Sequence, residues 1–130
     1  LAARAMGADL AYMGSAFIAT EEANANPAYK QALVDYAASD IVYTNLFTGV
    51  HGNYLRPSIE SAGLDPDNLP PSDPSKMQFG SGGSGKSKAW KDIWGCGQGI
   101  NAIKSVQPTA DLVERLINEY QEAQKRVLAA

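Results

Sequence analysis

Residues Gly80 to Ser87 match letter for letter the pattern G-x-x-x-x-G-K-[ST], which cradles nucleotide phosphates in phosphate-binding loops. Such a loop needs a buried strand before its glycines and a helix directly after its Lys-Ser pair, so that backbone amides converge on the phosphates. The preceding PPSDPSKMQF contains three prolines and two serines, which argue against a central strand. We therefore interpret the match as a glycine- and serine-rich loop rather than a nucleotide site.

A second glycine pattern, Gly97-x-Gly99-x-x-Ala102, resembles the dinucleotide-binding fingerprint G-x-G-x-x-G/A. That fingerprint follows a short aliphatic strand, whereas the residues before this one, WKDIW, carry two charges and two indole rings. We expect a tight turn where the backbone packs closely against another element.

The third candidate follows the short apolar segment Ala8 to Met13, which has the character of a buried parallel strand and ends at Gly14 and Ser15. Ligands of parallel α/β proteins gather beyond the carboxyl ends of strands, and loops after the last strands of a barrel commonly hold a phosphate. Gly14 allows close approach, while Ser15 and the free amides of the next turn can donate hydrogen bonds. The residues alone leave both a phosphate site and an ordinary strand-to-helix turn open.

The composition restricts the class of protein. A length of 130 residues with 45% hydrophobic residues is typical of one globular domain. The net charge of -3 favours no nucleic-acid partner, and one cysteine with one histidine excludes an internal disulfide and the usual zinc sites. No apolar run approaches the roughly 20 residues that span a bilayer, so we expect no membrane partner and a cytoplasmic location. The chain opens on a helix that runs directly into a strand, and we expect it to begin within a larger protein.

The order of the predicted elements is typical of α/β proteins, in which helices alternate with short strands. We expect helices at Leu1 to Met6, Ala28 to Ala38, Arg56 to Ala62, Ile100 to Val106 and Ala110 to Leu128, strands at Ala8 to Met13 and Ile41 to Thr48, a long loop at 64–88, and one or two helical turns at Ala89 to Trp94. Asn26 and Thr109 are expected to cap the helices that follow them.

The stretch GADLAYMGSAFIATEEANANPAYKQALVD resembles the nitronate monooxygenase family, formerly called 2-nitropropane dioxygenases. The family's pattern here is GAD-x-x-x-x-G-[ST]-x-F-x-x-[TS]-E-E. The later segments TGVHGNYLRPSI and KAWKDIWGCGQGINAIK are also similar to the C-terminal region of this family. The resemblance covers essentially the whole chain, but only about the C-terminal third of a family member.

The resemblance implies the C-terminal part of an FMN-binding TIM barrel. Residues 1–38 would form the last strand-helix unit with the FMN phosphate contact, 39–106 a smaller α/β lid domain, and 107–130 a C-terminal helix. The implied activity of the whole protein is the oxidation of small-molecule alkyl nitronates with O2, with FMN as cofactor. The fragment itself is expected to be inactive, because the family's catalytic histidine lies upstream of these residues.

The resemblance also assigns residues to the cofactor site. Tyr12, Met13, Gly14 and Ser15 match the family's four-residue contact with the FMN phosphate. Gln98 matches a residue of the family's AGQG stretch and is a further candidate near the active-site mouth. We assign no catalytic residue and no metal ligand: His51 lies in the implied lid segment, and Cys96 is interpreted as a small packing residue.

Two other readings remain. In the first, the whole protein to which this chain belongs is a flavin enoyl reductase-like enzyme on the same barrel. Only residues upstream of this chain distinguish this enzyme from a nitronate monooxygenase. Alternatively, the chain is a non-catalytic interaction module that binds a partner through an apolar stripe on its final helix, formed by Leu112, Val113, Leu116, Ile117 and Tyr120.

Overall fold

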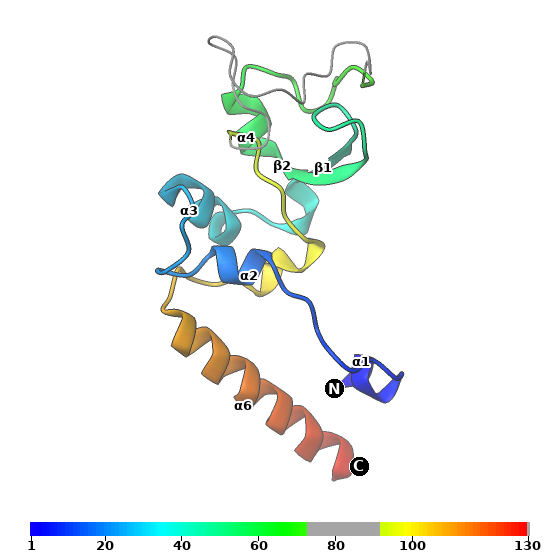
Figure 1. The fold of residues 1–130 in the computed structure, drawn as a ribbon, viewed down its shortest axis with the longest axis vertical. Helices are drawn as coiled ribbons and strands as arrows, with labels where there is room; N and C mark the ends of the chain where they lie inside the picture. The colour runs from blue at the N-terminus through cyan, green and yellow to red at the C-terminus, as the bar shows by residue number, and fades with distance from the viewer. Residues whose placement is uncertain (73–91, 130) are drawn as a thin grey trace.

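The computed structural model describes residues 1–72 and 92–129. The Gly80–Ser87 pattern, the first half of the helical turns predicted at 89–94 and most of the loop predicted at 64–88 fall outside these residues. The molecule is elongated, with a β-hairpin at one end and a long helix at the other (Figure 1).

Short helices and one hairpin make up the body of the chain. The helices are α1 (Ala2–Ala5), α2 (Ser15–Ile18), α3 (Pro27–Asp35), α4 (Arg56–Ser61) and α6 (Thr109–Leu128), with 3-10 helices η1 (Ala38–Asp40) and η3 (Gln98–Ala102) and strands β1 (Ile41–Thr44) and β2 (Gly52–Leu55). This mixture confirms the prediction of an α/β chain at the level of element content.

Strands β1 and β2 pair antiparallel, with Ile41 opposite Leu55 and Thr44 opposite Gly52. The predicted strand to Thr48 ends early because the Gly49 amide donates to the Asn45 carbonyl at 2.8 Å, and this turn is completed by Gly49 at φ 77°. A later segment adds to the free edge of β2. The Leu55 amide donates to the Trp94 carbonyl at 2.8 Å.

The core lies between the hairpin and the helices at the middle of the molecule. Its buried side chains lie in, or directly after, α2, α3, β2 and η3. They are Ala19, Ala32, Leu33, Leu55, Ile100 and Ile103. Tyr29 and Trp94 pack against this cluster, and their rings stack with centroids 5.3 Å apart. The core therefore joins α2 and α3 to the Gly-rich turn and to the hairpin.

The cap predicted for α3 is confirmed, because the Asn26 carboxamide oxygen accepts from the Ala28 amide at 2.9 Å and Pro27 occupies the first turn. The helix ends at Asp35, three residues before the predicted end. The helix predicted at 100–106 is instead the 3-10 helix η3, which begins at Gln98 and ends at Ala102.

The predicted strand Ala8 to Met13 is wrong for this chain: residues 8–14 are in neither helix nor strand and are exposed to solvent. A parallel strand exists only through hydrogen bonds to its neighbours, and its apolar side chains are buried only when helices cover the sheet. The described residues contain no strand that pairs with this segment. Leu10, with 92% of its surface exposed, shows the consequence most clearly.

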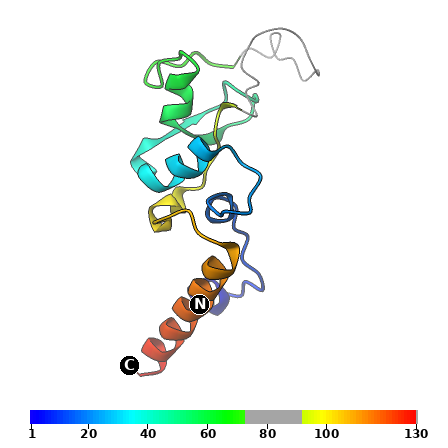
Figure 2. The same ribbon diagram turned by 90° about the vertical axis from the view of Figure 1, so that its left-hand side faces the viewer.

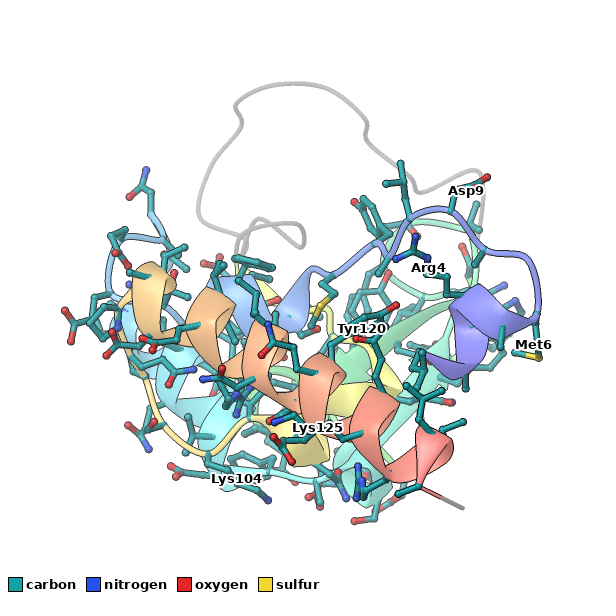
Figure 3. All side chains as sticks on the ribbon, turned by 90° about the horizontal axis from the view of Figure 1, so that it is seen from below. Arg4, Met6, Asp9, Lys104, Tyr120 and Lys125 are labelled. Atoms are coloured by element: carbon teal, nitrogen blue, oxygen red, sulfur yellow. The ribbon has the colours of Figure 1, made fainter. Side chains whose placement is uncertain are left out.

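Helix α6 leaves the body after its first turns, as Figure 2 shows. The predicted apolar stripe is present, yet Leu112 is its one buried member, and Val113 and Ile117 are exposed. Helix α1, near the start of the chain, lies beside the middle of this helix. A guanidinium nitrogen of Arg4 in α1 lies 3.3 Å from the Tyr120 hydroxyl and donates to it (Figure 3).

The start of α6 is capped from a distant part of the chain. Pro108, not the predicted Thr109, is the N-cap residue, and proline has no side-chain acceptor for the helix amides. The Glu22 carboxylate takes over this role: it accepts the Thr109 amide at 2.9 Å and the Thr109 hydroxyl at 2.8 Å. These hydrogen bonds lower the pKa of Glu22 below its ordinary value of 4.5, and the bond from the Thr109 hydroxyl has the largest effect.

Acid should therefore weaken the attachment of α6. Because the folded pKa of Glu22 is lowered, its stabilising contribution is fully present above the pKa of the unfolded residue and is lost as the pH falls through the folded pKa. We expect the Thr109 amide resonance to shift, and the protection of this amide from hydrogen exchange to fall, in that acidic window. The Glu22→Gln variant should lack this transition, and an identical acid titration in both proteins would rule the carboxylate out as the cause.

Candidate functional site

The site predicted from the sequence centres on the turn between the exposed segment 8–14 and α2. Gly14 is the N-cap residue of α2, and its carbonyl accepts the amides of Phe17 and Ile18, each at 3.0 Å. Within the described part of the chain, the amides of Ser15 and Ala16 have no acceptor. Two backbone donors at the start of this turn are therefore free for a ligand.

The Ser15 hydroxyl adds a third donor. Its oxygen accepts the Gly97 amide at 2.8 Å, and it donates to no residue that the structure describes. A hydroxyl has one hydrogen and two lone pairs, so the hydrogen remains available after this contact. Free amides and a hydroxyl hydrogen are the donors that a phosphate group requires.

Gly14 leaves open space at the turn. A Cβ atom built on it would meet no other atom within 4 Å, and its φ of -111° is one that any residue can adopt. Neither backbone strain nor packing within this chain therefore requires a glycine here. The absence of a side chain instead keeps the surface beside the free donors open to an anionic group.

The four predicted cofactor residues are placed in two environments. Gly14 and Ser15 form the start of α2, whereas Tyr12 and Met13 lie on the exposed segment before it. The Tyr12 side chain is fully exposed and Met13 is partly exposed. The structure brings donors together at Gly14 and Ser15, and it gives the side chains of Tyr12 and Met13 no hydrogen-bond partner in the described residues.

Gln98 and His51, the two other residues considered from the sequence, lie in different parts of the molecule. Gln98 is the first residue of η3 and directly follows Gly97, which bonds to Ser15, so it lies next to the turn. His51 lies in the loop between β1 and β2, where its ring stacks on Tyr43 with centroids 4.9 Å apart.

Two partly buried groups beside the Gly-rich turn are neutral at ordinary pH. Burial raises the pKa of the Cys96 thiol to about 11, and it packs against the core as predicted. Burial, and then the charge of the nearby Cys96, raises the pKa of Tyr29 to about 12. The Tyr29 hydroxyl donates to the Gly95 carbonyl. These groups hold the turn in place and are not activated nucleophiles or bases.

Residues 1–72 and 92–129 offer neither a cluster of metal ligands nor a membrane-spanning helix. They contain no group of three or more His, Cys, Asp or Glu side chains placed to hold a metal ion. No helix in these ranges is both long and apolar enough to cross a bilayer.

A solved structure shares this fold. The M276A mutant of FabK from Thermotoga maritima superimposes with a TM-score of 0.66 over 98% of this chain and 39% of its own, at 19% sequence identity. The predicted α/β class thus agrees with the fold of a known protein. That this chain forms the last part of a complete barrel stays a prediction.

The sequence defines the family more closely. Residues 1–119 match the family model of nitronate monooxygenase, and the chain belongs to this family. A protein named probable nitronate monooxygenase from Staphylococcus haemolyticus is 28% identical over 124 residues, which cover 92% of this chain and 34% of that protein. The chain therefore spans about a third of the length of the curated relative that it matches.

Sequence reasoning missed how the turn is held. The glycines at 97 and 99 indicated a close backbone approach, but nothing in their spacing named Ser15 as the partner of the Gly97 amide. The role of Glu22 was also missed. Its partner is 87 residues away in the sequence, and local patterns of capping residues do not detect so distant a contact.

Proposed function

We propose that this chain is part of an FMN-dependent oxidoreductase that oxidises alkyl nitronates with O2, and that its Gly14–Ser15 turn binds the FMN phosphate. Membership of the nitronate monooxygenase family supports the reaction class. The observation that carries the site is the set of free donors at the turn, the Ser15 hydroxyl hydrogen and the amides of Ser15 and Ala16, beside the open surface at Gly14.

The residues of the turn fit a phosphate by their chemistry. Each donor is fixed by the start of α2 or by the contact with Gly97, so little ordering is needed when an anion binds. The segment with Tyr12 and Met13 leads into the turn, and we propose that it completes the contact. When bound, FMN supplies the redox chemistry, taking reducing equivalents from the substrate and passing them to O2.

The chain's own contribution is binding and orientation of the cofactor. No residue in it is proposed as a catalytic base, because Cys96 and Tyr29 stay protonated and are used to hold the Gly-rich turn. We therefore propose that the 130-residue chain alone does not turn over nitronates, and that the base and the substrate pocket belong to the remaining part of a complete enzyme.

A comparison of FMN with riboflavin tests this function, since the two flavins differ only by the phosphate. Quenching of flavin fluorescence should show FMN binding to the chain at least about tenfold more tightly than riboflavin, because charge-assisted hydrogen bonds contribute about 1.5–3 kcal/mol. Inorganic phosphate should compete with FMN and leave riboflavin unaffected. Equal affinity for both flavins would refute a phosphate site in this chain.

A further inference from the structure

The segment Trp94–Gly97 is hydrogen-bonded to several other elements along its short length. The Trp94 amide donates to the Ser58 hydroxyl in α4 at 3.0 Å, and the Trp94 carbonyl accepts from Leu55. The Gly95 carbonyl accepts from Tyr29 of α3, and the Cys96 amide donates to the Asn53 carbonyl of β2 at 3.1 Å. The Gly97 amide then reaches Ser15 in α2.

We name residues 94–97 the strap. It runs along the outer edge of β2 and ends at the turn that carries the free donors, directly before Gln98. Its last bond, from Gly97 to Ser15, is the one link between the strap and the Gly14–Ser15 turn among the hydrogen bonds of the described residues.

We propose that Gly97 is a positioning residue for the phosphate site: its amide fixes the Ser15 hydroxyl, so that phosphate binding and the conformation of the strap are coupled. This inference rests on the proposed function, because it assumes that Ser15 donates to a phosphate. It goes further by assigning a role to a residue that would not touch the cofactor and by linking the site to the hairpin.

The physical basis is the orientation of one hydroxyl group. By occupying a lone pair of Ser15 Oγ, the Gly97 amide limits the rotation of the side chain and leaves its hydrogen for an outside acceptor. A hydroxyl that donates to an anion becomes a better acceptor, so a bound phosphate should strengthen the bond from Gly97. Without the Gly97 donor, Ser15 must be ordered when the ligand binds, and affinity falls.

The chain offers a matched pair of substitutions at Gly97. Gly97→Pro replaces the amide hydrogen with a ring carbon, so the Ser15 hydroxyl loses its donor and must rotate away from this position. The φ of -85° at Gly97 lies close to the value that proline requires. Gly97→Ala keeps the amide, and its Cβ would lie 3.7 Å from Ser15 Oγ, an ordinary contact. Neither substitution removes a group that is proposed to touch FMN.

The test combines FMN titrations with amide hydrogen exchange measured by NMR on the full 130-residue chain. We expect Gly97→Pro to bind FMN about three- to tenfold more weakly than Gly97→Ala, with equal riboflavin affinity. In the wild type, FMN should slow exchange of the Gly97 amide and riboflavin should not. The Leu55 amide, bound to the other end of the strap, should exchange at the same rate in both variants if the strap is intact.

A second pair of variants tests the link without any ligand. Ser15→Ala should accelerate exchange of the Gly97 amide about tenfold or more, and Ser15→Thr, which keeps the hydroxyl, should restore the wild-type rate. Equal FMN affinity of the two Gly97 variants, or FMN binding that leaves Gly97 exchange unchanged, overturns the coupling and leaves the phosphate site standing. If FMN does not bind the wild type, the proposed function fails in this chain. The coupling between phosphate binding and the strap then fails with it, whatever the Ser15 variants show.

Discussion

Replacing Ile100 by alanine should lower the free energy of unfolding by about 2–5 kcal/mol, or leave the chain unfolded in water. Ile100 is 0% exposed and lies in the cluster that joins η3 to Leu33 of α3 and Leu55 of β2. The loss combines the transfer free energy of the deleted methyl groups with the cavity that they leave. Urea denaturation followed by circular dichroism measures it directly.

Leu10→Ala is the matched control for this experiment, because it also truncates a large aliphatic residue but at a position with 92% exposure. We expect its effect to stay within about 0.5 kcal/mol. If Leu10→Ala destabilised the chain as much as Ile100→Ala, the segment 8–14 would be part of the core, contrary to the structure.

Ser58→Ala should cost about 1–3 kcal/mol, because it removes a buried hydroxyl that serves two partners. The Ser58 side chain donates to the Leu55 carbonyl at 2.7 Å and accepts the Trp94 amide, and the residue is 1% exposed. Alanine would leave the Trp94 amide without its acceptor at the start of the strap. Thermal unfolding and the exchange rate of the Trp94 amide give the two readouts.

Ser61→Ala provides the comparison for Ser58 within the same helix. The Ser61 hydroxyl also donates to a backbone carbonyl, that of Pro57, at 2.7 Å, but the residue is exposed and water replaces the contact. We expect a change below about 0.5 kcal/mol. Equal costs for both serines would show that the link from α4 to the strap adds no stability.

Local signals in the sequence were sufficient for the elements that depend on local chemistry. Asn26 and Pro27 marked the start of α3, and Gly63, at φ 77°, marked the end of α4. The apolar spacing after residue 109 predicted α6 to within one residue at its start. Each of these signals acts within a few residues, so a single sequence contains it completely.

Features that depend on distant partners could not be predicted in this way. The apolar run Ala8 to Met13 has the composition of a strand, but composition does not supply the neighbouring strands that make one. The contacts of Ser15 with Gly97 and of Glu22 with Thr109 join residues more than 80 positions apart. The sequence therefore located the candidate turn, and the structure identified which of its donors are free.

The most direct test of the phosphate site is an absorbance titration of the chain with FMN, run on the wild type, Gly14→Ala and Gly14→Trp. Because a Cβ atom at Gly14 would meet no atom within 4 Å beyond its chain neighbours, and the residue is exposed, we expect the folded protein to tolerate both substitutions, with changes in unfolding free energy below about 0.5 kcal/mol. The account predicts that the wild type binds FMN and that the indole at position 14 weakens binding by at least about tenfold by covering the free donors, with a smaller effect from alanine. FMN binding that is unchanged in a stably folded Gly14→Trp variant would contradict it.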